Sequence, residues 1–234
     1  MRPLVVDIDG TITDRNRAVD PRVFSVLREW PAPVVIATGK AFPYPVGLCE
    51  FIGLPTRVIA ENGGVVCIGE HVAIEGDREG ARAVLDAYVE RGHDPGWDEA
   101  DLANRWRETE AIVRRESPLS PLEELAGERG LEVVDTGFAY HVKSPDVDKG
   151  QGLVVAAEEL CWAPNEFVAI GDSVNDVDTF AVAGDSYAVS NADERARAAA
   201  DVVTDGAYAE GFLEAIETIE AIGAGEADER PSGR

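Results

Sequence analysis

Cysteine is scarce in this sequence of 234 residues, which holds three, at Cys49, Cys67 and Cys161. They are scattered and form no C-x-x-C pair, so neither a disulfide framework nor a zinc site is indicated. Long hydrophobic runs are lacking too, because no stretch approaches the ~18 apolar residues of a transmembrane helix. No charged and then apolar leader precedes the first apolar run. We therefore expect a cytoplasmic protein that does not enter membranes.

Positive charge is in short supply. Against 45 Asp and Glu there are 21 Lys and Arg, a formal net charge of −24, and the lysines are Lys40, Lys143 and Lys149. An acidic excess of this size repels nucleic acids and anionic membrane surfaces, so neither is an expected partner. We hypothesise adaptation to a cytoplasm with multimolar salt, which screens repulsion over a few ångströms. Circular dichroism showing equal stability in dilute buffer and in concentrated KCl would contradict this hypothesis.

Several well-known catalytic motifs are absent as well. The sequence has neither the G-x-x-x-x-G-K-[ST] phosphate loop nor the G-x-S-x-G turn of serine hydrolases. An EF-hand loop is excluded because Gly10 follows Asp7 and Asp9 too early. The three histidines show no metal-ligand spacing. The chemistry of the chain must therefore come from other residues.

Strand and helix patterns alternate in the N-terminal part. Short apolar runs predict buried strands at 4–6, 34–37, 58–60 and 65–68, the last as a local hairpin. Asp20 and Pro21 predict the start of a helix that lasts to about Trp30, because aspartate caps helices and proline fits the first helical position. Alternating elements with apolar strands predict an α/β fold built on a doubly wound, Rossmann-like parallel sheet.

The pattern changes after about residue 76. Helical spacing over 77–90 is followed by strand, helix, strand and strand patterns at 111–113, 121–128, 131–134 and 139–142. This order is typical of an inserted α+β unit. The alternation of helix and strand then resumes, with elements at 149–160, 167–170, 175–183 and 187–189.

The change of pattern divides the chain into three parts. We expect a catalytic core of residues 1–75 and 149–222, interrupted by an α+β cap domain of residues 76–148. Residues 223–234 have no core-forming pattern, so we expect a disordered tail there.

Residues that carry chemistry follow the predicted strands. Asp7 and Asp9 lie just after the first strand, where open α/β sheets place their ligands, and their spacing points both into one pocket. Two crowded carboxylates repel each other unless a cation lies between them or one of them holds a proton. Three further groups follow strands or begin helices, at Thr38-Gly39, Lys149-Gly150 and 171–176. All four groups are expected to meet at the carboxyl edge of the sheet.

Each group alone has an ordinary explanation. Asp-Gly is a common turn dipeptide, and Asp172 and Asp176 are acids of the kind that a helix dipole favours. Thr38-Gly39 fits an ordinary strand exit, although a hydroxyl and a backbone N–H there also suit an anion. Lys149 fits a solvated residue, although a lysine kept among arginines suggests a compact charge is required. The common position of the four groups after strands favours a joint site.

The sequence resembles the haloacid dehalogenase-like (HAD) phosphatases over residues 3 to about 222. It matches their four motifs in order, at Asp7-x-Asp9-Gly10-Thr11, Thr38, Lys149 and Gly171-Asp172-x-x-Asn175-Asp176. The insertion resembles the C2-type cap of the Cof-like branch, and two further segments are similar to that branch, Glu61-Asn62-Gly63-Gly64 and Ser190-Asn191-Ala192. The segment 137–141 is similar to archaeal phosphoglycolate phosphatases. The resemblance implies a Mg²⁺-dependent phosphomonoesterase.

It also implies a role for each matched acid. Asp7 would attack phosphorus and become an aspartyl-phosphate. Asp9 would protonate the leaving alkoxide and then deprotonate the attacking water. Mg²⁺ would bind oxygens of Asp7, Asp9 (through its backbone carbonyl) and Asp172, and Asp176 would be a further ligand or would orient one.

The phosphoryl group would be held by Thr38, Gly39, Lys149 and Asn175. The expected partner is a small phosphorylated metabolite, above all 2-phosphoglycolate, acted on by a monomer or a small homo-oligomer. The alternatives are another small ester such as a sugar phosphate, or a mutase or phosphotransferase. A receiver-like phospho-switch is the non-enzymatic alternative, which the cap-sized insertion and Asp9 disfavour.

Specificity is expected to come from the cap. Four arginines there either reach a substrate carboxylate or face solvent, at Arg105, Arg107, Arg114 and Arg115. His141, on a predicted cap strand, either contacts such a carboxylate or, as is commoner for a strand histidine, packs.

Overall fold

Eight strands form the main sheet, in the order β11-β10-β9-β1-β2-β3-β4-β5. The computed structural model describes residues 1–228 of the chain. The strands are β1 (Leu4–Asp7), β2 (Val34–Ala37), β3 (Arg57–Ala60), β4 (Val65–Ile68), β5 (His71–Ile74), β9 (Val168–Gly171), β10 (Asp185–Ala188) and β11 (Val202–Val203). Pairing from β11 to β3 is parallel, whereas β4 and β5 add an antiparallel edge. The predicted parallel sheet is confirmed.

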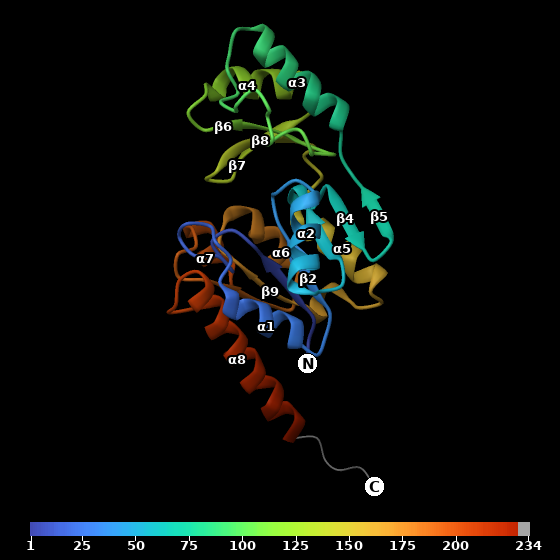
Figure 1. The fold of residues 1–234 in the computed structure, drawn as a ribbon, viewed down its shortest axis with the longest axis vertical. Coiled ribbons are helices and arrows are strands. Elements are labelled where there is room, and N and C mark those ends of the chain that lie inside the picture. Colours follow the sequence, from blue (N-terminus) through green and yellow to red (C-terminus); the bar gives the residue numbers. More distant parts are fainter. Residues whose placement is uncertain (229–234) are drawn as a thin grey trace.

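Helices cover both faces of this sheet (Figure 1). One face carries α1 (Pro21–Glu29), α2 (Pro43–Ile52) and α8 (Ala209–Asp228), and the other carries α5 (Lys149–Glu159), α6 (Val177–Val182) and α7 (Glu194–Ala199). As predicted, the Asp20 side chain caps α1 by accepting a hydrogen bond from Arg22 N, and Pro21 opens the helix. No helix in the described part of the chain is long and apolar enough to cross a membrane.

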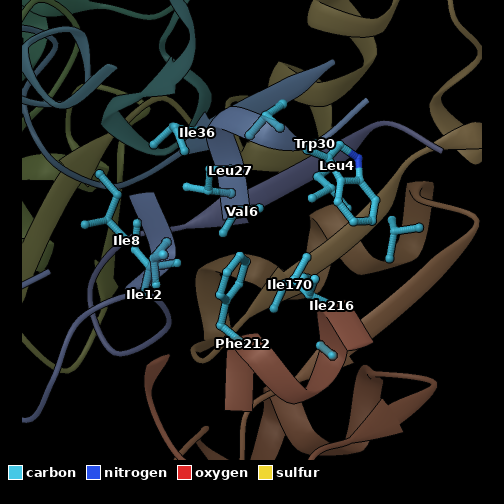
Figure 2. Packing of buried hydrophobic residues seen from close by; sticks show 14 of the residues in the cluster. Leu4, Val6, Ile8, Ile12, Leu27, Trp30, Ile36, Ile170, Phe212 and Ile216 are labelled. Carbon is cyan, nitrogen blue, oxygen red and sulfur yellow. The ribbon is translucent and has the colours of Figure 1, made fainter. Parts of the chain in front are cut away.

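Successive residues of the central strands β1, β2, β3 and β9 enter different cores. Leu4 and Val6 of β1 pack with Leu27 of α1 and Phe212 of α8 (Figure 2), whereas Val5 between them faces the cluster on the other side. Because neighbouring side chains of a strand alternate across the sheet, a strand covered on both faces must be apolar throughout. This two-sided burial explains the continuous apolar runs of the sequence.

A second, smaller unit is inserted between β5 and α5 (Figure 1). Its antiparallel sheet has the order β6-β8-β7 and consists of β6 (Ala111–Arg114), β7 (Glu132–Asp135) and β8 (Ala139–Lys143). Two helices accompany it, α3 (Arg78–Glu90) and α4 (Leu119–Gly127). It buries a core of its own that includes Tyr88, Val113 and Leu122. The fold is thus an α/β core with an inserted α+β cap, while the limits of the cap at 76 and 148 stay a prediction.

The C-terminal segment differs from the prediction. Residues 223–234 are expected to be disordered, but α8 continues to Asp228. Alanine and glutamate are strong helix formers, and they carry the helix past Gly223 although glycine disfavours it. Residues 229–234 lie outside the described residues. The helices α2, α7 and α8 and the strands β5 and β11 are elements that the sequence patterns do not predict.

Candidate active site

The four predicted groups meet at the carboxyl edge of the central strands. Asp7 is the last residue of β1, Thr38 follows β2, Gly171 ends β9, and Lys149 begins α5. The Lys149 side chain is fully buried, and its Nζ lies 2.7 Å from Asp7 Oδ1 and 2.7 Å from Asp176 Oδ1. Burial alone would lower the pKa of this ammonium, but the charges of Asp176 and Asp7 raise it instead. Lys149 therefore stays charged between two acids.

The loop after β9 is wound around the Asp176 carboxylate. Asp176 Oδ2 accepts hydrogen bonds from the backbone N–H groups of Asp172 and Ser173, each at 3.0 Å, while Oδ1 accepts one from Lys149. Both oxygens are thus engaged within the protein. Of the two roles that the resemblance implies, we propose that Asp176 orients the loop and the lysine.

Gly10 makes room for Asp172. Its φ of +84° lies in the left-handed region, which residues with a side chain rarely adopt. A Cβ at this position would overlap the Asp172 carboxylate. The Gly10 carbonyl accepts a hydrogen bond from Asn191 Nδ2 at 3.0 Å, which ties the loop after β1 to the late segment 190–192.

Three carboxylates form a cluster that suits a metal ion. Asp7, Asp172 and Asp176 each offer an oxygen, and these atoms all lie within 4.8 Å of one another. Burial raises the pKa of both Asp7 and Asp172, and the charge of Asp176 adds to the effect on each. A cation among them would favour the ionised forms. Because carboxylate oxygens are the ligands that Mg²⁺ takes, the cluster fits this ion, with Asp7 and Asp172 to hold it.

Asp9 lies apart from this cluster. Its Oδ2 is 2.8 Å from Lys40 Nζ, and its buried Oδ1 has no hydrogen-bond partner within residues 1–228. Its carboxylate lines a cavity rather than joining the other acids. A contact of its backbone carbonyl with Mg²⁺ stays a prediction.

A cavity of about 250 Å³ lies over the acids, with walls from both core and cap. The predicted site residues on its wall are Asp7, Asp9, Thr38, Gly39, Asp172 and Asn175. The cap contributes Arg107, Phe138 and His141. Lys149 is not part of the described lining but is buried where it holds Asp7. Its direct contact with a phosphoryl group therefore stays a prediction.

Thr38 and Asn175 are fixed by hydrogen bonds on this wall. Thr38 Oγ1 accepts one from the backbone N–H of Lys40 at 3.1 Å. Asn175 Nδ2 donates to Asn62 Oδ1 at 2.9 Å, and Asn175 Oδ1 accepts from Ser173 Oγ at 2.5 Å. Fixed polar groups of this kind position a bound anion at little entropic cost.

A buried polar junction joins core and cap beside the cavity. Glu110 Oε2 lies 3.0 Å from His141 Nδ1 and accepts a hydrogen bond from Asn62 Nδ2 at 3.0 Å, and Oε1 pairs with Arg107. Burial alone would raise the pKa of Glu110. The charges of His141 and Arg107, with the hydrogen bonds from His141 and Asn62, outweigh burial and lower the pKa of Glu110 to about 2. Glu110 thus stays ionised and holds the cap side chains that line the cavity.

Glu61 forms a second junction. Its Oε2 accepts hydrogen bonds from the backbone N–H groups of Glu108 at 2.9 Å and Thr109 at 2.8 Å, and from the Thr109 hydroxyl at 2.8 Å. Glu61 and Asn62 have φ of 53° and 55°, both in the left-handed region. Such strained backbone persists where the surrounding structure fixes it, often at functional sites. Here it aims both side chains at the cap.

The outcome for the cap residues singled out in the sequence is mixed. Of the four arginines, Arg107 reaches the cavity. The others lie elsewhere: Arg105 over the Trp106 ring, Arg114 over Trp97, and Arg115 paired with Asp135. His141 is packed in the junction and also lines the cavity.

Some residues of the site were not predicted. Glu110 gives no signal in the sequence, whereas the scarcity of lysine singles out Lys40. For Glu61 and Asn62 the only signal in the sequence is the similarity of their segment to the Cof-like branch.

We expect Mg²⁺ to change how stability depends on pH. Because burial raises the pKa of Asp7 and Asp172, the folded chain keeps protons that the unfolded chain, with carboxyl pKa values of about 4, has already lost. The free energy of unfolding should therefore fall as pH rises above about 5. A bound cation stabilises the ionised acids, so saturating Mg²⁺ should flatten this fall. Thermal unfolding from about pH 5 to 8, with EDTA or Mg²⁺, measures both slopes, and equal slopes would contradict the metal site.

The arrangement as a whole is an α/β core that carries an acidic cluster at the carboxyl edge of its sheet, facing an inserted α+β cap. A family profile described as haloacid dehalogenase-like hydrolase matches residues 123–216. The phosphoglycolate phosphatase of Haloarcula marismortui is 60% identical and aligns over 92% of this chain and 95% of its own. That of Archaeoglobus fulgidus is 40% identical over 93% of this chain and 96% of its own. The chain belongs to the haloacid dehalogenase-like hydrolase family.

Solved structures share the fold. Thermoplasma acidophilum 0175 has a TM-score of 0.81 at 24% identity, covering 94% of this chain and 98% of that one. A haloacid dehalogenase-like hydrolase from Bacteroides thetaiotaomicron has a TM-score of 0.76 at 21% identity, covering 93% and 99%. Relatives from haloarchaea, Haloarcula marismortui and Natronomonas pharaonis among them, agree with the salt adaptation that the acidic composition suggests.

Proposed function

We propose that this protein is a Mg²⁺-dependent phosphatase that hydrolyses 2-phosphoglycolate to glycolate and phosphate through an aspartyl-phosphate. The observation that carries the chemistry is the buried Lys149 ammonium, 2.7 Å from both Asp7 and Asp176, beside a cavity lined by both core and cap. The substrate is supported by relatives named phosphoglycolate phosphatase at 60% and 52% identity. A cavity of about 250 Å³ also suits a small ester.

In the first step, Asp7 attacks phosphorus. Lys149 engages Oδ1 of Asp7, so we assign the attack to Oδ2. A bond forms between this oxygen and phosphorus, the ester P–O bond breaks, and the departing alkoxide takes a proton from Asp9. We assign the binding of the phosphoryl oxygens to Thr38 and the Gly39 backbone N–H, because both residues line the cavity. Bound Mg²⁺ supplies the positive charge that lets the anionic nucleophile approach the anionic phosphoryl group.

In the second step, Asp9 acts as a base. It removes a proton from a water molecule, whose oxygen attacks phosphorus as the bond to Asp7 breaks. Inorganic phosphate leaves, and both aspartates return to their starting forms.

The test is phosphate release from a panel of phosphate esters that includes 2-phosphoglycolate and sugar phosphates. It is run in concentrated KCl, with Mg²⁺ or with EDTA, and Asp7→Asn serves as the blank. Preference for 2-phosphoglycolate with both controls inactive supports the proposal. Mg²⁺-dependent phosphate release that is fastest from another ester contradicts the assignment of 2-phosphoglycolate as the substrate. Transfer to added alcohols in place of water would indicate a phosphotransferase, and a folded protein that releases no phosphate would favour the receiver-like switch.

A further inference from the structure

Two of the three lysines lie at the active site, and each is paired with one aspartate of the first motif. Lys149 holds Asp7, and Lys40 Nζ lies 2.8 Å from Asp9 Oδ2. Their surroundings differ, because Lys149 is fully buried whereas the Lys40 side chain is 34% exposed and lines the cavity. The chain has 18 arginines but keeps the compact ammonium at both positions. The accessible one, Lys40, is suited to meet a ligand.

The backbone of Lys40 is held in place. Its N–H donates to Thr38 Oγ1 at 3.1 Å, and its carbonyl accepts a hydrogen bond from Glu61 N at 3.1 Å. The ammonium therefore projects from a fixed point beside the residue that would hold the phosphoryl group. A charge that is already positioned loses little entropy when an anion binds to it.

The position of Lys40 relative to Asp9 indicates which part of the substrate it meets. In the proposed mechanism Asp9 protonates the ester oxygen of the leaving group, so this oxygen must lie next to the Asp9 carboxylate. In 2-phosphoglycolate one methylene group separates that oxygen from the carboxyl carbon. An ammonium 2.8 Å from Asp9 is thus within reach of the substrate carboxylate. Since an ammonium has three N–H donors, Lys40 can serve Asp9 and the substrate together.

A second cation stands beside Lys40. Arg107 Nη1 donates to the Gly39 carbonyl at 3.0 Å and pairs with Glu110, and Nε donates to the Ala103 carbonyl at 2.9 Å. Its Nη2 makes no hydrogen bond within residues 1–228, and the side chain lines the cavity. Arg15 and Arg17 also line it but are exposed to water, where charge pairs contribute little.

We propose that Lys40, with Arg107 beside it, binds the carboxylate of the substrate's leaving group and makes the enzyme selective for phosphate esters with an anionic tail. This inference rests on the proposed function, because the substrate carboxylate is located relative to Asp9, the proposed general acid. Lys40 is then a specificity residue that touches substrate. If Lys40 merely neutralised Asp9, its loss would slow all esters alike.

The experiment compares two esters of the same size. These are 2-phosphoglycolate and 2-hydroxyethyl phosphate, in which a CH₂OH group replaces the carboxylate. For Lys40→Gln we expect kcat/KM for 2-phosphoglycolate to fall on the order of 10- to 100-fold, the usual effect of losing a hydrogen-bonded charge pair. The value for 2-hydroxyethyl phosphate should change little. Lys40→Arg, which keeps the charge, should retain most of the preference.

Arg105→Gln is the matched control, since it removes one cation from the cap, outside the lining of this cavity. It should leave both substrates unaffected. If Lys40→Gln lowers kcat/KM equally for both esters, or leaves the ratio of the two values unchanged, the inference is overturned. The proposed function still stands in that case, provided that the wild type prefers 2-phosphoglycolate. A wild type that does not prefer 2-phosphoglycolate overturns the substrate assignment itself. Circular dichroism of each variant in concentrated KCl establishes that it is folded.

Discussion

Asp7→Asn is expected to abolish turnover and to leave the fold intact. The amide is a far weaker nucleophile than a carboxylate, so the aspartyl-phosphate cannot form, and loss of a nucleophile costs on the order of 10⁴-fold or more in kcat. The fold should survive because Asn has nearly the shape of Asp and because burial already disfavours the Asp7 charge, as its raised pKa shows. Phosphate release and denaturant unfolding, both in concentrated KCl with Mg²⁺, measure the two effects.

The control for this experiment is Asp86→Asn, the same change at an exposed position of α3. It should match the wild type in both assays. If Asp7→Asn kept more than about 1% of wild-type kcat, far above the activity left when a nucleophile is removed, then Asp7 would not be the nucleophile. If the Asp7→Asn variant failed to fold, the conclusion that burial disfavours the Asp7 charge in the folded protein would be wrong.

Lys149→Met is expected to damage both activity and stability. Removing one partner of a buried ion pair leaves charge uncompensated and costs about 3–5 kcal/mol, and here Asp7 and Asp176 lose the same partner. The variant should unfold at lower denaturant concentration and depend more strongly on Mg²⁺ for its stability. Its kcat should fall by orders of magnitude even where it is folded, because Asp7 is no longer held for attack.

Lys143→Met provides a matched comparison. Lys143 is also buried and paired, through Glu132, but it lies on β8 in the cap and not among the catalytic acids. Its loss should lower stability without lowering the kcat of the folded protein. Should Lys149→Met behave in the same way, with turnover intact after correction for the folded fraction, Lys149 would be a structural residue only.

The sequence predicts those parts of the site that local patterns encode. The apolar run of β1 leads directly to Asp7, and Asp20 with Pro21 marks the start of α1, because strand burial and helix capping act within a few residues. The approach of Lys149 to Asp7 is not local, yet it follows from topology, since the carboxyl ends of neighbouring parallel strands share one edge.

The junction of core and cap is not encoded in this way. Glu110 lies in the loop just before β6, His141 lies on β8, and Asn62 lies in the core after β3, so no periodicity relates them. The hydrogen bond from Asn62 to Glu110 exists only once the cap lies on the core. The end of α8 shows a different limit, because the lack of a core-forming pattern predicts an unstructured tail, whereas helix-forming alanine and glutamate continue the helix to Asp228.

Asn62 has a consequence for attempts to redesign this enzyme. One end of its amide donates to Glu110 in the cap, and the other accepts from Asn175 in the loop that follows β9. A cap transplanted from a relative to change the range of substrates would therefore have to supply an acceptor where Glu110 stands. Without one, the Asn62 side chain loses a partner in a buried setting. The two halves of this enzyme are, in engineering terms, not interchangeable modules.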